Sequence, residues 1–146
     1  MKKPMWLYMA PDLATGMKGG ISSFGNPLVW WVGIPCFFSS LLFAYKKRDK
    51  YMGLVLTAFV FQYAPWVFVA RSTFIYHYFS SIPFVIFFIV YTIKNLIDAK
   101  VINRAVVFTY LGAVLVLFAI YYPVISGLEV TEKYSNALRL FSTWSW

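Results

Sequence analysis

The sequence predicts an all-α integral membrane protein with four transmembrane helices, and two observations support this. First, 61% of the 146 residues are hydrophobic and 12% are charged, whereas about a quarter of a soluble domain is charged. A domain this small exposes much of its surface, and these polar side chains are too few to cover it. Second, the chain contains four long apolar runs. Each is near the roughly 20 residues that cross a bilayer core of about 30 Å as a helix.

The sequence divides into three parts. Residues 1–27 are mostly polar and rich in turn formers, and they predict an irregular extracytoplasmic or interfacial segment with a short helix over Met17–Ile21. Residues 28–125 form the transmembrane block. Its four spans are predicted at 28–45, 51–70, 74–93 and 105–125. Prolines inside these runs do not argue against helices, because neighbouring helices can satisfy the freed carbonyls. Residues 126–146 form an aromatic tail, with Tyr134, Leu138 and Phe141 at helical spacing.

Lys and Arg between the spans predict the orientation. The first and third spans are followed by basic loops at 46–50 and 94–104, whereas the loop between the second and third spans contains only Arg71. Cytoplasmic loops carry the excess of Lys and Arg, so both ends of the chain and the 71–79 turn are predicted to be extracytoplasmic. In a bacterium this would be a multi-pass plasma-membrane protein. Lys2, Lys3 and Lys18 oppose this orientation but are outnumbered. The net charge of +8 does not predict nucleic-acid binding, because the cations lie at the ends of apolar runs.

The 71–79 turn holds the candidate binding residues. Arg71 is the only charged residue between Lys50 and Lys94, and His77 is the only histidine. Arginine binds phosphate through two parallel hydrogen bonds, and His77, Tyr76 and Tyr78 add donors. These residues predict an anion site at the outer membrane edge, suited to a lipid phosphate. The alternative is that Arg71 extends to the lipid headgroups and His77 is an ordinary interfacial residue.

No complete active site is visible in the sequence. We find no metal-ligand spacing, no phosphate-binding glycine-rich motif and no serine elbow. The carboxylates are scattered through loops and the tail, and Cys36 is the single cysteine. We therefore expect no catalytic residue, metal site or cofactor in this chain.

Two motifs resemble those of a known family. The run Gly25-Asn26-Pro27-Leu28-Val29-Trp30-Trp31 resembles the "GNP-x-x-WW" opening of the last membrane block of protein O-mannosyltransferases. Arg71-x-x-Phe74-x-Tyr76-His77-Tyr78, followed by Pro83-Phe84, is similar to their "R-x-x-F-x-Y-H-Y-x-x-x-x-P-F" stretch. Pro4-Met5-Trp6-x-Tyr8 and the segment 121–127 also match this family, so the resemblance covers nearly the whole chain.

The resemblance implies the C-terminal part of a GT-C type glycosyltransferase. Such enzymes move mannose from a polyprenyl or dolichyl phosphate carrier to Ser or Thr hydroxyls of an acceptor protein. Arg71, His77, Tyr76 and Tyr78 would supply the lipid-phosphate side of the site. The family's acidic catalytic pair lies in an N-terminal half that this sequence does not contain. The expectation is therefore a fragment or a split enzyme that works with a separate N-terminal half.

Other functions stay open at this point. The chain could be a non-catalytic four-span membrane subunit or a remnant. It could also belong to a related GT-C transferase with another sugar or acceptor, such as lipid A. A transporter is less favoured, because the first, second and fourth spans lack the mid-membrane charges that such proteins use.

Overall fold

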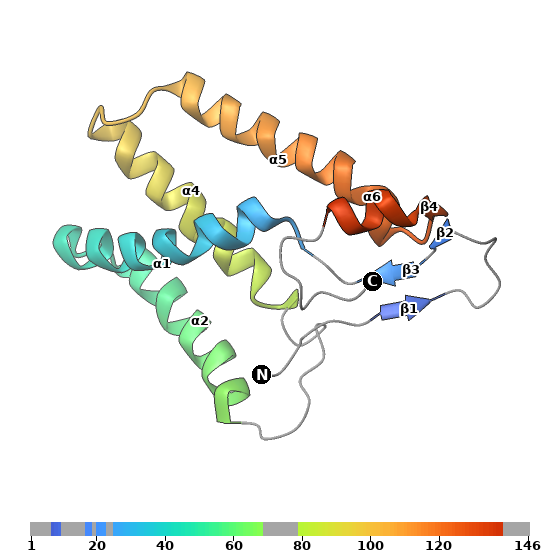
Figure 1. Cartoon of the computed structure of the whole chain (residues 1–146). Coiled ribbons are helices and arrows are strands. Elements are labelled where there is room, and N and C mark those ends of the chain that lie inside the picture. Colours follow the sequence, from blue (N-terminus) through green and yellow to red (C-terminus); the bar gives the residue numbers. More distant parts are fainter. Residues whose placement is uncertain (1–6, 10–16, 19, 23–24, 69–78, 139–146) are drawn as a thin grey trace.

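The computed structural model describes residues 7–9, 17–18, 20–22, 25–68 and 79–138. Over these residues the chain is mostly helical (Figure 1). The helices are α1 (Pro27–Lys47), α2 (Lys50–Phe68), α4 (Ile82–Asp98), α5 (Arg104–Ile125) and α6 (Glu132–Ala137). The strands are β1 (Leu7–Met9), β2 (Met17–Lys18), β3 (Gly20–Ser22) and β4 (Val130–Thr131). Among the described helices, α1 and α5 are long and apolar enough to cross a membrane.

Local signals set the ends of α1 and α5. Asn26 caps α1, because its side-chain oxygen accepts a hydrogen bond from the backbone N–H of Leu28 at 3.0 Å. The helix ends where Arg48 adopts a left-handed backbone with φ of 50° and ψ of 40°. Asn103 caps α5 in the same way through Val106 N at 3.1 Å. Gly127, with φ of 83°, follows its last turn, and glycine adopts this conformation without strain.

The helix α4 differs from the span predicted over 74–93. It begins at Ile82, so Pro83 lies in the first turn rather than inside the helix. Proline is favoured there because a first-turn N–H has no partner within the helix. At its other end α4 passes Lys94 and continues to Asp98. A charged residue marks where the apolar run ends, but it does not stop a helix.

The helices α1 and α4 form the centre of the packing, and α2 flanks them (Figure 1). Their core contains Cys36, Ala44, Met52, Leu56, Val85, Phe88 and Ile89. The turn between α1 and α2 and the loop between α4 and α5 lie at one end of this block, which we call the basic end because both are rich in Lys and Arg. The other end, where α1 and α4 begin, we call the aromatic end.

Short strands join the two terminal regions of the chain. β1 pairs antiparallel with β3, and β2 pairs antiparallel with β4, with Met17 opposite Thr131. The expected helix over Met17–Ile21 is therefore wrong, and the all-α prediction missed these strands. Strands of two or three residues have too little periodicity to detect, and the partner of β2 lies at the far end of the chain.

The short helix α6 packs against the end of α5. The Tyr121 hydroxyl donates to the Leu138 carbonyl at 3.1 Å, and the Tyr134 hydroxyl donates to the Ile120 carbonyl at 2.7 Å. Tyr121 and Val124 form a small second core with Leu117, Val130 and Leu138. Tyr134 and Leu138 thus lie on or just after a helix, as their spacing suggested. Phe141 lies outside the described residues.

Candidate functional site: an aromatic pocket between three helices

The motif that opens α1 has a structural role at each of its first residues. A Cβ atom on Gly25 would lie 2.0 Å from the indole nitrogen of Trp30, so only glycine leaves room for this ring. Asn26 caps the helix and also donates from Nδ2 to the Val114 carbonyl of α5 at 2.8 Å. Pro27 occupies the first turn. The motif therefore fixes the start of α1, joins it to α5 and places the tryptophans that follow.

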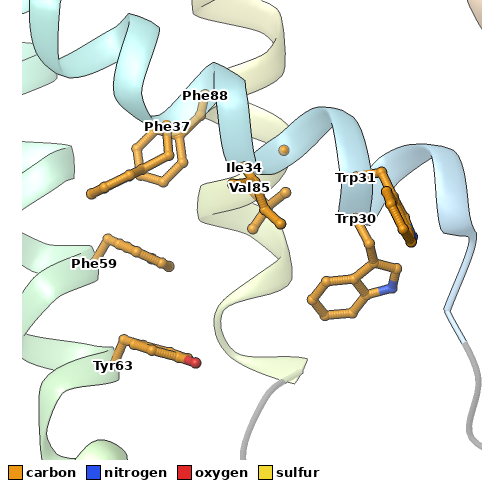
Figure 2. A pocket seen from close by; sticks show the side chains of 9 residues that line it. Trp30, Trp31, Ile34, Phe37, Phe59, Tyr63, Val85 and Phe88 are labelled. Carbon is orange, nitrogen blue, oxygen red and sulfur yellow. The ribbon is translucent and has the colours of Figure 1, made fainter.

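These tryptophans line a pocket at the aromatic end, between α1, α2 and α4 (Figure 2). Its volume is about 340 Å³. The lining residues are Trp30, Trp31, Gly33, Ile34, Phe37, Phe59, Tyr63, Val85 and Phe88. Aromatic rings and aliphatic groups dominate this lining, which suits an apolar ligand with few polar contacts.

Three phenylalanine rings close the inner side of the pocket. Phe37, Phe59 and Phe88 come from α1, α2 and α4, and their centroids are 5.2–5.4 Å apart. Phe88 is edge-on to both of the others, and such geometries are favoured by the ring quadrupoles. Tyr63 extends the aromatic surface, because its ring stacks on Phe59 at 5.7 Å. Figure 2 shows both of these α2 rings extending towards α4.

Close contact between α1 and α4 fixes the side of the pocket near Gly33. A Cβ atom on Gly33 would lie 2.3 Å from Cγ1 of Val85. Gly33 is buried, and Val85 is 8% exposed. Only glycine permits this approach, so the small residue in α1 sets the distance between the two helices.

A buried polar cluster holds α1 to α4 directly below the phenylalanine rings. The Ser40 hydroxyl donates to the Phe88 carbonyl at 3.2 Å and lies 3.3 Å from the Thr92 hydroxyl. Thr92 in turn donates to the Cys36 carbonyl at 3.2 Å. We call Ser40 and Thr92 the hydroxyl clamp. It satisfies two buried hydroxyls and fixes the register of the helices that carry Phe37 and Phe88.

A second polar contact lies at the basic end. Asp49 caps α2 by accepting from the backbone N–H groups of Tyr51 and Met52, both at 3.1 Å. Its other oxygen accepts from the Tyr91 hydroxyl of α4 at 3.1 Å. The hydrogen bond from Met52 lowers the pKa of Asp49 most; Tyr91, Tyr51 and the charge of Lys94 lower it further, against the opposing effect of desolvation. Asp49 is therefore a structural carboxylate that joins α2 to α4.

The sequence-predicted residues Arg71, Tyr76, His77 and Tyr78 lie outside the described residues. They belong to the connection between the end of α2 and the start of α4, the two elements that flank the aromatic end. Near this connection, Gln62 Nε2 donates a hydrogen bond to the Ser80 hydroxyl. This contact joins α2 to the chain just before α4.

Most of the pocket was not predicted from the sequence. Trp30 and Trp31 stood out as motif residues, but no sequence pattern brought Phe37, Phe59 and Phe88 together. The available signal was aromatic spacing, since Phe59 with Tyr63 and Phe84 with Phe88 recur at i and i+4, where side chains share a helix face. Within the described residues no group of three His, Cys, Asp or Glu side chains could hold a metal ion.

Comparison with known proteins gives distant relatives of one kind. The chain is 21% identical over 154 aligned positions to the polyprenol-phosphate-mannose–protein mannosyltransferase of Corynebacterium glutamicum, covering 97% of this chain and 30% of that protein. It is 22% identical to enzymes of the same name from Mycobacterium tuberculosis and Mycolicibacterium smegmatis, covering 82% of this chain and 24–25% of theirs. The chain thus spans less than a third of their length. No solved structure matches it.

The family assignment rests on nearly the whole chain. Residues 5–144 match the family described as the C-terminal four TMM region of protein-O-mannosyltransferase. This span includes every described helix and strand. The chain therefore belongs to the family of C-terminal four-transmembrane regions of protein O-mannosyltransferases.

Proposed function

We propose that this chain is the C-terminal membrane portion of a GT-C type glycosyltransferase that moves mannose from a polyprenyl phosphate carrier to protein Ser or Thr hydroxyls. Its part would be to hold the lipid carrier. The observation that carries the proposal is the aromatic pocket between α1, α2 and α4. The names of the relatives supply the substrate class, a polyprenol phosphate that carries mannose.

The position of the pocket supports this role. The described residues that line it are uncharged, whereas Lys46, Lys47, Lys94 and Lys100 lie at the basic end. With the basic end facing the cytoplasm, the pocket lies on the extracytoplasmic side of a multi-pass membrane protein. The four spans of the proposed topology are α1, α2, α4 with the residues before it, and α5. The terminal regions would then lie outside the cytoplasm.

Sequence placement suggests where the phosphate binds. The connection from α2 to α4 contains Arg71, the only cation between Lys50 and Lys94, together with Tyr76, His77 and Tyr78. Both helix ends that it joins flank the aromatic end. We propose that Arg71 binds the carrier phosphate through paired hydrogen bonds and that the other three residues add donors. Such cations stabilise the negative charge that develops on the departing phosphate.

The proposed division of labour leaves acid–base chemistry to another part of the enzyme. A base must take the proton from the acceptor hydroxyl as it attacks the sugar. Asp49, Asp98 and Glu129 lie in or next to turns, Glu132 begins α6, and none of these residues lines the pocket. We propose that an N-terminal portion, as in the longer relatives, supplies this base and contacts the acceptor protein.

Binding to the full chain in lipid nanodiscs tests the phosphate role. We expect Arg71→Ala to weaken binding of polyprenyl phosphate mannose by about tenfold or more, because a charged hydrogen-bond partner is removed. The matched control is Lys94→Ala, which removes one cation at the basic end and should leave binding unchanged. Equal binding by wild type and Arg71→Ala, with normal thermal unfolding, would contradict the proposal.

Transfer is measured in a longer relative. The arginine of the matching motif in the Corynebacterium glutamicum protein is replaced by alanine, and mannose incorporation into an acceptor protein is followed with the lipid donor. We expect transfer to fall in proportion to carrier binding. Near-normal transfer at normal expression would remove Arg71 from the proposed site.

A further inference from the structure

We infer that the pocket is closed at a fixed depth and holds only the isoprene units nearest the phosphate, while the rest of the carrier leaves it sideways into the bilayer. This inference rests on the proposed function and goes beyond it. It states which part of the lipid is recognised and predicts that total chain length matters little.

The pocket extends only part of the way along α1. On α1 the pocket reaches from Trp30 near the start of the helix to Phe37. Phe37 is ten positions beyond Pro27, the first residue of α1, which is about 15 Å along the helix at roughly 1.5 Å per residue. This is about half of a bilayer core of about 30 Å. An occupant whose phosphate lies at the outer interface can therefore extend only to about the middle of the membrane.

Phenylalanine rings and the hydroxyl clamp close the inner side of the pocket. Phe88 is 0% exposed and packs against Phe37 and Phe59, and no described residue nearer the basic end than these three lines the pocket. Directly beneath them the hydroxyl clamp holds α1 to α4. Deeper insertion would separate these helices and break buried hydrogen bonds, whose groups are costly to leave unpaired inside a membrane. The bottom of the pocket is thus a fixed stop.

The pocket is open on the side formed by the exposed lining residues of α1. Two residues that line the pocket on α1 are also widely exposed, Trp31 at 60% and Ile34 at 64%. Between Ile34 and Tyr45 the exposed side chains of α1 are apolar, namely Pro35, Phe38, Leu41 and Leu42. The pocket is therefore continuous with a lipid-facing surface. A long chain can turn at the phenylalanine rings and leave along this surface, and it meets no exposed polar side chain of α1 before Tyr45.

The rigid shape of the pocket favours an isoprenoid over an acyl chain as its occupant. Aromatic neighbours and cross-helix hydrogen bonds fix the shape of the pocket, so it is preorganised. Immobilising a flexible ligand opposes binding, because its bonds lose rotational freedom. An isoprenoid loses less of this freedom than a saturated acyl chain, because its double bonds leave fewer rotatable bonds. The occupant that fits is therefore the isoprenoid chain of the carrier and not an acyl chain of the surrounding phospholipid.

The test uses the full chain in nanodiscs and a photoactivatable prenyl phosphate as the probe. Citronellyl, farnesyl, geranylgeranyl and undecaprenyl phosphates compete with it at equal mole fraction in the bilayer, so that partitioning does not imitate affinity. We expect competition to increase through the short carriers and then to level off, with undecaprenyl within about twofold of geranylgeranyl phosphate. Phosphatidic acid, which has a similar phosphate but acyl chains, should compete far less.

Two substitutions at similarly exposed positions of α1 locate the site. Ile34→Trp fills the pocket and should weaken crosslinking by about tenfold, the lower end of what a poorly fitting group costs in an apolar pocket. Leu42→Trp adds the same side chain at a position that is 60% exposed and does not line the pocket. It should stay within about twofold of wild type, as surface substitutions usually do. Thermal unfolding is measured for both, and Ile34→Ala, which removes lining contacts, should also weaken crosslinking if Ile34→Trp fails to fold.

Each contrary result has a distinct meaning. Competition that keeps rising through undecaprenyl phosphate, equal competition by phosphatidic acid, or crosslinking unaffected by both Ile34 substitutions would overturn this inference alone. Crosslinking that no prenyl phosphate can compete for would overturn the proposed function as well.

Discussion

The two ends of the helical block are built by different physical means. At the basic end, the turns are held by local devices: the left-handed Arg48, the Asp49 cap and the Asn103 cap, each within a few residues of its partner. At the aromatic end, Gly33, Phe37, Phe59 and Phe88 meet across three helices. The turns of the basic end are thus set mainly by short-range sequence, with the Tyr91–Asp49 hydrogen bond as a contact between distant residues, whereas the pocket is set by how the helices pack. Substitutions that separate these contributions test the comparison.

The largest effect is expected at Gly33. In Gly33→Ala the new methyl group would meet Val85 at 2.3 Å, and forcing extra atoms into a packed interior costs about 1–3 kcal/mol. The matched control is Gly53→Ala in α2, where a Cβ atom meets nothing within 4 Å. That change should stabilise the helix by about 0.5–1 kcal/mol, because glycine is a poor helix former. Thermal unfolding in detergent measures both.

A second variant sharpens the Gly33 result. Val85→Ala removes the methyl group that the new alanine side chain of Gly33→Ala would meet. The double variant with both changes should therefore recover part of the stability that Gly33→Ala loses by itself. Equal shifts of the same sign for Gly33→Ala and Gly53→Ala would show that α1 and α4 are not in the close contact described.

A smaller effect is expected from the hydroxyl clamp. Thr92→Val keeps the shape of the side chain but removes its hydrogen bonds to Cys36 and Ser40. Such bonds between membrane helices are worth about 1 kcal/mol. Ser40→Ala and the double variant with Thr92→Val complete a double-mutant cycle. In this cycle the effects of the two substitutions on the free energy of unfolding should not be additive. Additive effects in that cycle would mean that the two hydroxyls act independently.

The smallest effect is expected at Asp49, and it depends on pH. The folded state holds the pKa of this carboxyl below its ordinary value, chiefly through the Met52 hydrogen bond. A lowered pKa stabilises the fold above the unfolded-state pKa, and this contribution is lost as pH falls through the folded-state value. Asp49→Asn should therefore lower the unfolding temperature at neutral pH. The difference from wild type should shrink on acidification below the normal carboxyl range. A difference that stays constant with pH would contradict this role for the Asp49 charge.

Sequence patterns predicted a mostly helical membrane region but not every element of it. Apolar runs placed α1, α2 and α5 to within a few residues, because hydrophobic length is a strong signal in membrane segments. The helix α4 begins at Ile82, inside the predicted span 74–93, whose first residues lie outside the described ones. An apolar run does not show where a helix begins. The signal was present in Pro83, because proline is favoured in the first turn of a helix; Ser81 precedes the helix, but its side chain makes no capping hydrogen bond. The strands at Met17–Lys18 and Val130–Thr131 left no comparable signal.

The candidate site also has features that the sequence determined and features that only helix packing decided. By itself the sequence determined the membrane character, the motif residues Gly25 to Trp31 and the family, since these depend on composition and short spacing. Only the tertiary structure decided that Phe37, Phe59 and Phe88 meet in one pocket and that the clamp of Ser40 and Thr92 lies beneath it. The physical reason is that many exposed and buried positions of a membrane helix are equally apolar. Hydrophobicity therefore identifies such a helix, but close packing at residues such as Gly33 decides which face meets its neighbours.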